Sequence, residues 1–164
     1  MPRREDLLRG IYGHGFESPS VIQQRAIRPL ACSHKDVIAQ AQSGTGKTAA
    51  FSIGVLQTLD PEIAACQALI LSPTRELAMQ IFDVLRLVGK HHSSLSAGLL
   101  IGGKREFQLE QQQVGRMSLL VATPGRLLQH LEQTPGFDAG QLQVRQAGRQ
   151  AGRQAFHQSV SRSV

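Results

Sequence analysis

Apolar residues follow two alternating patterns along the first 133 residues of the chain. Short, compact apolar runs are typical of buried strands, and we expect four of them, at 36–41, 67–72, 96–102 and 117–122. Longer segments space their apolar residues as one face of a helix does, and we expect helices at 6–12, 19–31, from about residue 47, and at 75–89, 105–114 and 124–133. Ser20 is expected to cap the second helix, and Pro124 to occupy the first turn of the last one. Strands that alternate with helices predict an α/β fold with a parallel sheet flanked by helices.

The pattern ends at residue 145, where "RQAGRQAGRQAF" repeats a four-residue unit in tandem. Residues 139–164 contain no Asp or Glu and are dominated by Gln, Arg, Gly and Ser, which offer too little apolar surface to order a chain. We therefore expect a folded domain over 1–144 and a disordered, low-complexity basic tail over 145–164. An RNA-binding tail and an unstructured terminus without a selected role both fit this composition.

Composition places the chain among globular proteins, with 41% hydrophobic and 18% charged residues. No apolar run approaches the roughly 18 residues of a membrane span, and the charged N-terminus does not resemble a secretory signal. Cys32 and Cys66 fit no metal-ligand spacing. We expect an intracellular protein without a membrane partner, and the nucleus, nucleolus and cytoplasm all stay open as its compartment.

The net charge of +6 does not by itself indicate a nucleic-acid-binding domain. Residues 145–164 hold four of the 18 basic residues and none of the 12 acidic ones, so most of the basic excess lies in the predicted tail. An argument for RNA binding by the domain must therefore rest on motifs.

The segment "AQSGTGKT", residues 41–48, has the spacing of a phosphate-binding loop, with Ala41 where the first glycine usually stands. Glycines let successive backbone N–H groups surround phosphate oxygens, and the N-terminus of the following helix adds its positive dipole. Lys47 is expected to reach the β- and γ-phosphates, and the Thr48 hydroxyl to bind Mg²⁺ held with the nucleotide. The chain contains no asparagine, which excludes the Asn-Lys-x-Asp element by which GTPases read guanine. A small-molecule kinase stays possible from the loop alone.

Five elements in one order extend the interpretation: "GFESPSVIQ" (15–23), "AQSGTGKT" (41–48), "PTRELA" (73–78), "GG" (102–103) and "TPGR" (123–126). Together they resemble the N-terminal motifs of DEAD-box ATP-dependent RNA helicases. The resemblance implies a truncated RecA-like (P-loop NTPase) parallel sheet, the N-terminal part of the first of the family's two RecA-like domains. Segments near 7–27 and 36–51 look like the translation-initiation-factor subgroup, whereas 72–104 and 123–144 look more like a nucleolar, ribosome-biogenesis subgroup.

The resemblance also implies roles for individual residues. ATP and its Mg²⁺ would contact Phe16, Pro19, Gln23, Gln42, Ser43, Gly44, Thr45, Gly46, Lys47 and Thr48. Within that set, Gln23 matches the glutamine that reads adenine through its amide. The RNA backbone would contact Pro73, Thr74, Arg75, Gly102, Gly103, Thr123, Pro124, Gly125 and Arg126. Contacts of this kind recognise phosphates and ignore base identity, so RNA binding is expected to be independent of sequence.

The family's Asp-Glu-Ala-Asp element, its Ser-Ala-Thr element and its second RecA-like domain with the arginine finger do not occur in the 164 residues. In the family the acidic element organises Mg²⁺ and the attacking water. After Arg126 the only acidic residues are Glu132 and Asp138, and the one adjacent acidic pair is Glu5–Asp6. We therefore assign no catalytic residue and expect negligible ATP hydrolysis and no unwinding by the chain alone. A non-enzymatic nucleotide- or RNA-binding decoy and an aberrant product that does not fold stably stay open as alternatives.

Overall fold

The computed structural model describes residues 4–32, 36–92, 95–103, 117–133 and 144–147. Its helices are α1 (Arg4–Gly13), α2 (Val21–Cys32), α3 (Lys47–Thr58), α4 (Arg75–Val88) and α6 (Pro124–Gln133), and its strands are β1 (Ala68–Leu71), β2 (Ala97–Leu100), β3 (Leu119–Ala122) and β4 (Val144–Ala147). Within this part of the chain, the periodicity of the sequence predicted every helix and the strands β1, β2 and β3. The helix expected at 105–114 lies outside the described residues.

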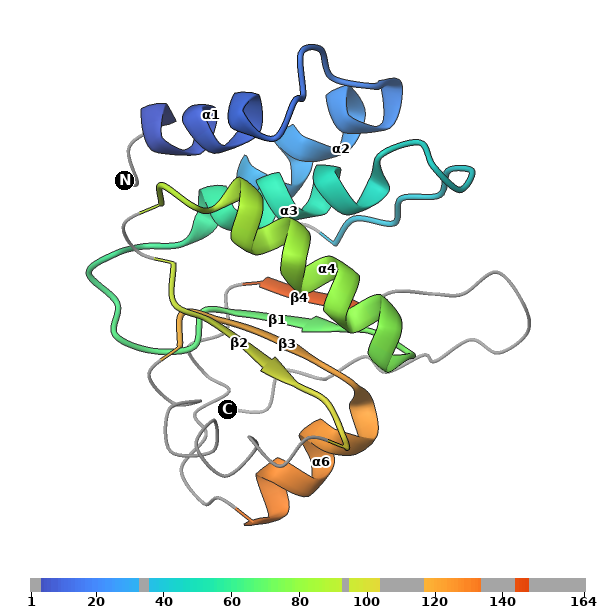
Figure 1. Ribbon diagram of the computed structural model, residues 1–164, viewed down its shortest axis with the longest axis vertical. Coiled ribbons are helices and arrows are strands. Elements are labelled where there is room, and N and C mark those ends of the chain that lie inside the picture. Colours follow the sequence, from blue (N-terminus) through green and yellow to red (C-terminus); the bar gives the residue numbers. More distant parts are fainter. Residues whose placement is uncertain (1–3, 33–35, 93–94, 104–116, 134–143, 148–164) are drawn as a thin grey trace.

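All strand pairs are parallel, and the sheet has the order β2-β3-β1-β4 (Figure 1). β1 and β3 align Ala68 with Leu119 and Leu71 with Ala122, and β2 aligns Ala97 with the same Leu119. The carboxyl ends of β1, β2 and β3 therefore meet at one edge of the sheet. The predicted parallel α/β fold is confirmed.

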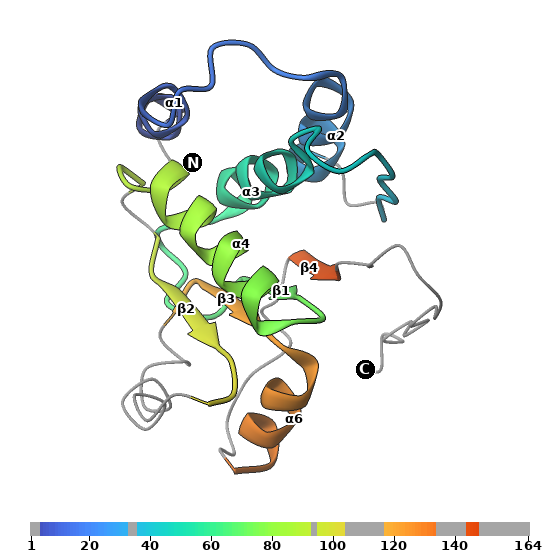
Figure 2. The same ribbon diagram turned by 45° about the vertical axis from the view of Figure 1, so that its right-hand side comes forward.

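Helices cover both faces of the sheet, with α3 and α4 on one side and α6 on the other (Figures 1 and 2). Alternating residues of β3 serve the two faces: Leu119 and Val121 join the core under α3 and α4, whereas Leu120 and Ala122 join the smaller cluster that contains Leu127 of α6. This continuous burial explains why β3 is apolar at every position rather than at alternate ones.

Helix α3 is the most deeply buried helix of the fold and lies between α2 and α4. Leu56 is fully buried, Val55 is 1% exposed, and Leu59 directly after the helix is fully buried as well. Burying each such side chain stabilises the folded state by about 1.5–3 kcal/mol. Gly54 lets α2 approach closely, because a Cβ atom there would lie 2.7 Å from the Cβ of Leu30.

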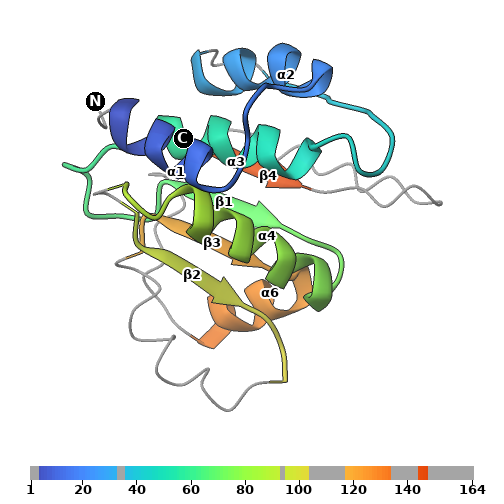
Figure 3. The same ribbon diagram turned by 45° about the horizontal axis from the view of Figure 1, so that its top comes forward.

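The prediction of a strand at 36–41 is wrong. These residues follow α2 in an extended path that no described strand accompanies, and Ile38 is 99% exposed (Figure 3). Among the described strands, β1 is paired on both sides, with β3 and with β4, so no edge of β1 is left for 36–41. A strand is stable only when a neighbour satisfies its backbone groups, and apolar sequence alone does not supply that neighbour.

Strand β4 crosses the boundary that the sequence predicted at residue 144. Its backbone pairs with β1 from Val144 to Ala147, so the first residues of the predicted tail belong to the sheet. The division into 1–144 and 145–164 stays a prediction, because 148–164 lie outside the described residues. None of the helices in the described ranges combines the length and apolar character that crossing a bilayer requires.

The contact between α1 and α4 yields a stability prediction. A Cβ atom added at Gly10 would lie 1.8 Å from the carbonyl oxygen of Val88, so Gly10→Ala must push α1 away from α4. We expect a loss of about 1–3 kcal/mol in the free energy of unfolding, although alanine favours a helix more than glycine does. Urea unfolding followed by circular dichroism measures the change.

Gly13→Ala, at the end of the same helix, is the matched control, because no atom outside its chain neighbours lies within 4 Å of the added Cβ. It should leave stability unchanged or slightly raised. Equal stabilities for the two variants would contradict the packing described for α1. A wild-type chain without a cooperative transition would instead favour the alternative of a product that does not fold stably.

Candidate functional site

The glycine-rich loop before α3 adopts the conformation that its glycines permit. Gly44 and Gly46 have φ angles of 77° and 87°, in the left-handed region that other residues avoid. α3 begins directly after the loop at Lys47, and a helix leaves the N–H groups of its first turn without partners inside the helix. The loop and helix together therefore present unpaired donors and a positive dipole end to an anion.

Lys47 holds the loop closed upon itself. Its Nζ donates to the carbonyl oxygen of Ala41 at 2.6 Å and also to that of Gln42, and the Thr45 hydroxyl donates to the Gln42 carbonyl at 2.8 Å. A phosphate oxygen carries full negative charge and is a stronger acceptor for an ammonium group than a carbonyl. Phosphate can therefore replace these two carbonyls as the partner of Lys47.

Gln23 ties helix α2 to the phosphate loop. Its Oε1 accepts from the backbone N–H of Ser20 at 2.8 Å, and its Nε2 donates to the carbonyl of Gly46 at 3.4 Å. The Ser20 hydroxyl donates to the carbonyl of Thr45 at 2.9 Å, which adds a second link. Gln23 is only 6% exposed, and each half of its amide keeps one further hydrogen-bonding position.

The sequence carries a signal for the hydrogen bond between Ser20 and Gln23. Ser20-x-x-Gln23 at the start of a helix has the spacing of a capping box, in which the third helical residue bonds back to the N-cap. The predicted N-cap at Ser20 is consistent with α2 beginning at Val21. Its hydroxyl, however, bonds to the loop at Thr45.

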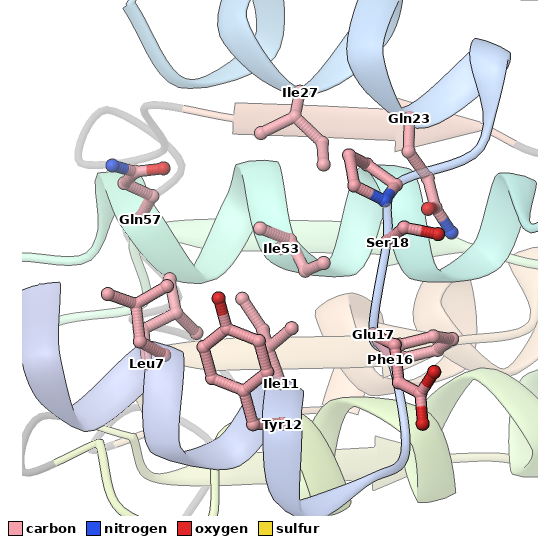
Figure 4. Close-up of a pocket in the computed structure, with 12 residues that line it drawn as sticks. Leu7, Ile11, Tyr12, Phe16, Glu17, Ser18, Gln23, Ile27, Ile53 and Gln57 are labelled. Carbon is pink, nitrogen blue, oxygen red and sulfur yellow. The ribbon is translucent and has the colours of Figure 1, made fainter.

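A cavity of about 310 Å³ lies beside Gln23, between α1, α2 and α3. Figure 4 shows Ile53 and Gln57 of α3 between the side chains of α1 (Leu7, Ile11 and Tyr12) and those of α2 (Ile27 and Gln23). Phe16 and Pro19, both assigned to the nucleotide side, line it too. The contribution of α1 was not foreseen from the sequence. The cavity offers apolar walls with an amide at one end, which suits a flat ring with a polar edge.

Thr48, half-buried in the first turn of α3, is the residue assigned to Mg²⁺. No group of three or more His, Cys, Asp or Glu side chains in the described ranges is placed to hold a metal ion. One hydroxyl is a fitting ligand for Mg²⁺ only when phosphate oxygens and waters complete the octahedron.

A second site lies at the edge of the sheet where β1, β2 and β3 end. A groove of about 280 Å³ is lined by Arg75, Gly102, Thr123, Gly125, Arg126 and Gln129. The sequence assigned the first five to RNA, and the parallel sheet brings them together although they come from three separate motifs. Two helices, α4 and α6, also begin at this edge.

Arg75 lies over the glycine pair that follows β2. A Cβ atom at Gly102 would lie 3.1 Å from Nη2 of Arg75, and one at Gly103 would lie 2.8 Å from Nη1. Gly103 also has a φ angle of 97°. The two glycines therefore leave room for the guanidinium group, and the positive φ angle of Gly103 favours glycine at that position.

Arg126 lies in the first turn of α6, and its Nη1 donates to Oε1 of Gln129. His130, on the next position of the helix, is 1% exposed, and burial together with the nearby charge of Arg126 lowers its pKa. The histidine is therefore neutral at pH 7 and adds no charge of its own. Gln129 was missed by the sequence reasoning, whose only available signal was its spacing of three from Arg126.

The remaining residues assigned to RNA flank this groove. Thr74 is the N-cap of α4, and its Oγ1 accepts from the N–H of Leu77 at 3.3 Å. Pro73 and Pro124 are exposed next to the starts of the two helices. The predicted roles of these three residues in RNA binding stay predictions.

Comparisons with known proteins agree with the motifs. The sequence profile described as DEAD/DEAH box helicase matches residues 20–145. Curated relatives include the ATP-dependent RNA helicase DBP4 of Coccidioides immitis, 47% identical over 88% of this chain and 18% of its own length. The ATP-dependent RNA helicase eIF4A of Neurospora crassa is 53% identical over 77% of this chain and 32% of its own. The chain thus spans less than a third of the length of these relatives.

Solved structures extend the agreement to the fold. A DEAD box protein from Methanococcus jannaschii superposes with a TM-score of 0.75 at 30% identity, covering 84% of this chain and 37% of its own. The S. cerevisiae Dbp5 bound to RNA and ADP BeF3 gives 0.73 at 30% identity, covering 87% and 44%. The described α/β sheet is thus a RecA-like fold, and the chain belongs to the DEAD/DEAH box helicase family.

Proposed function

We propose that this chain is the ATP- and RNA-binding part of a DEAD-box RNA helicase and that its 164 residues alone bind both ligands without hydrolysing ATP. The observation that carries the proposal is the glycine-rich loop before α3, in which Lys47 bonds to the carbonyls of Ala41 and Gln42 that phosphate could replace, while no acidic pair follows Arg126. ATP-dependent RNA unwinding is the activity named for the relatives. An intracellular location is part of the proposal.

Nucleotide binding would use the N-terminal end of α2 and the N-terminal end of α3, which meet at the loop. Lys47 would exchange the carbonyls of Ala41 and Gln42 for phosphate oxygens, which bind an ammonium group more strongly. Gln23 would hold the loop through Gly46 and present its remaining donor and acceptor to the edge of adenine. When bound, Mg²⁺ would neutralise phosphate charge, with Thr48 as its protein ligand.

RNA binding would use the groove at the carboxyl edge of the sheet. Arg75 and Arg126 supply two cations, and no acidic side chain is among the described residues that line the groove. The helix N-termini of α4 and α6 favour the same negative charge. Since these groups recognise phosphates, the proposed ligand is single-stranded RNA of any sequence.

The proposed lack of ATP hydrolysis follows from where the acidic residues of the chain lie. Beyond Arg126 the sequence holds only Glu132 and Asp138, which are not adjacent, and the Glu5–Asp6 pair lies in the first turn of helix α1, which packs against α3 and α4. We therefore assign no residue of this chain to activate a water molecule for attack on the γ-phosphate. A chain that binds RNA and ATP without hydrolysing ATP would act as a non-enzymatic decoy.

Replacement of Lys47 tests the nucleotide site. Lys47→Ala removes a charge-assisted contact, so we expect its affinity for a fluorescent ATP analogue to fall roughly tenfold to a hundredfold. Lys90→Ala, at an exposed lysine after α4, is the matched control and should bind as the wild type does. Equal affinities for the two variants would contradict a phosphate site at the loop.

Replacement of the two arginines tests the RNA groove. The double variant Arg75→Ala/Arg126→Ala should bind labelled single-stranded RNA more weakly and with a shallower salt dependence, by roughly 0.7 in the log–log slope per lost phosphate contact. Arg25→Ala/Arg28→Ala removes the same charge from the exposed face of α2 and should change binding little. Unchanged binding by the first pair, with loss on deletion of 148–164, would assign RNA binding to the C-terminal repeat instead.

A further inference from the structure

Gln129 occupies a position in the RNA groove that none of the matched motifs includes. It lies on α6 three residues after Arg126, on the same side of the helix, and lines the groove together with Arg75 and Thr123. Its side chain is exposed, so its amide can reach a ligand that lies in the groove.

The amide of Gln129 orders Arg126 without neutralising it. Its Oε1 accepts a hydrogen bond from Nη1 of Arg126, which restricts one of the most flexible side chains in the groove. A carboxylate at this position would bond to the guanidinium group as well, but it would also cancel the charge that attracts phosphate. The neutral amide adds no charge that opposes that of Arg126, and restricting the side chain beforehand lowers the entropy cost of binding.

The other half of the same amide is a donor. Because Oε1 is directed to Arg126, the Nε2 group carries two N–H bonds that suit a phosphate or ribose oxygen. Amide side chains of this kind are common among the groups that contact nucleic-acid backbones.

We infer that Gln129 is a further RNA-binding residue of this chain, which positions Arg126 through Oε1 and donates from Nε2 to an oxygen of the RNA backbone. The inference rests on the proposed function, because it assumes that RNA occupies the groove at the carboxyl edge of the sheet. It adds Gln129 to that site. It also predicts that a neutral side chain serves this position better than a carboxylate, which would oppose the charge of Arg126.

Two substitutions in the full chain separate these roles. Gln129→Ala removes both hydrogen bonds and should weaken binding to a labelled ten-nucleotide oligouridylate by roughly threefold to tenfold. Gln129→Glu keeps the shape and the acceptor but adds a negative charge, and we expect it to weaken binding more than Gln129→Ala does. It should also lower the salt slope by roughly 0.7, the value of one lost phosphate contact.

Gln133→Glu is the matched control, since it adds the same charge to an exposed residue four positions further along α6, outside the residues that line the groove. It should change the affinity less than twofold. In an Arg126→Ala background the effect of Gln129→Ala should shrink, because the positioning role no longer has a partner.

The outcomes separate the inference from the function on which it rests. Loss of binding in Arg126→Ala, with Gln129→Ala and Gln129→Glu both binding as the wild type does, would overturn the role of Gln129 and leave the RNA groove standing. Salt-independent or absent binding by the wild-type chain would overturn the RNA groove itself. Equal weakening by Gln129→Glu and Gln133→Glu would reduce the effect to general charge and also overturn the inference.

Discussion

Burial of helix α3 is the interaction on which the rest of the molecule depends. Leu56 and Leu59 are fully buried, and α1, α2 and α4 all contact this helix, so its axis is fixed by packing on several sides. Its N-terminal end is thereby held beside Ser20 and Gln23, which bond to the last carbonyls of the phosphate loop. A loop rich in glycine has little conformational preference of its own. Here the conformation of the loop is set by the packing of α3 against the core and by the hydrogen bonds from α2.

The parallel sheet holds the residues of the second site in place. Three motifs that lie far apart in the sequence each follow a strand, and parallel pairing delivers the three strand ends to one edge. The glycine pair after β2 then makes room for Arg75, while Gln129 orders Arg126. Both sites thus obtain positive potential from helix N-termini and from a few cations held by neutral groups.

Most of the fold could be predicted because β1 and β3 are buried almost throughout and helices such as α4 and α6 carry one apolar face. The segment 36–41 could not, since its apolar residues do not show whether it pairs with a strand; it pairs with none of those described, and Ile38 is exposed. Three of the motifs were assigned to RNA by resemblance alone, and the parallel register explains why the structure brings them together. Gln129 escaped notice because a polar residue on an exposed helix face looks the same whether it binds a ligand or only water.

The most direct test of the account is the rate of phosphate release from ATP by the full chain with Mg²⁺ and single-stranded RNA, measured beside Lys47→Ala. The account predicts that the wild type binds the nucleotide and yet releases phosphate no faster than the variant, because the proposed site pairs a phosphate-binding loop with no residue assigned to activate water. Phosphate release by the wild type above that of Lys47→Ala, stimulated by RNA, would contradict it.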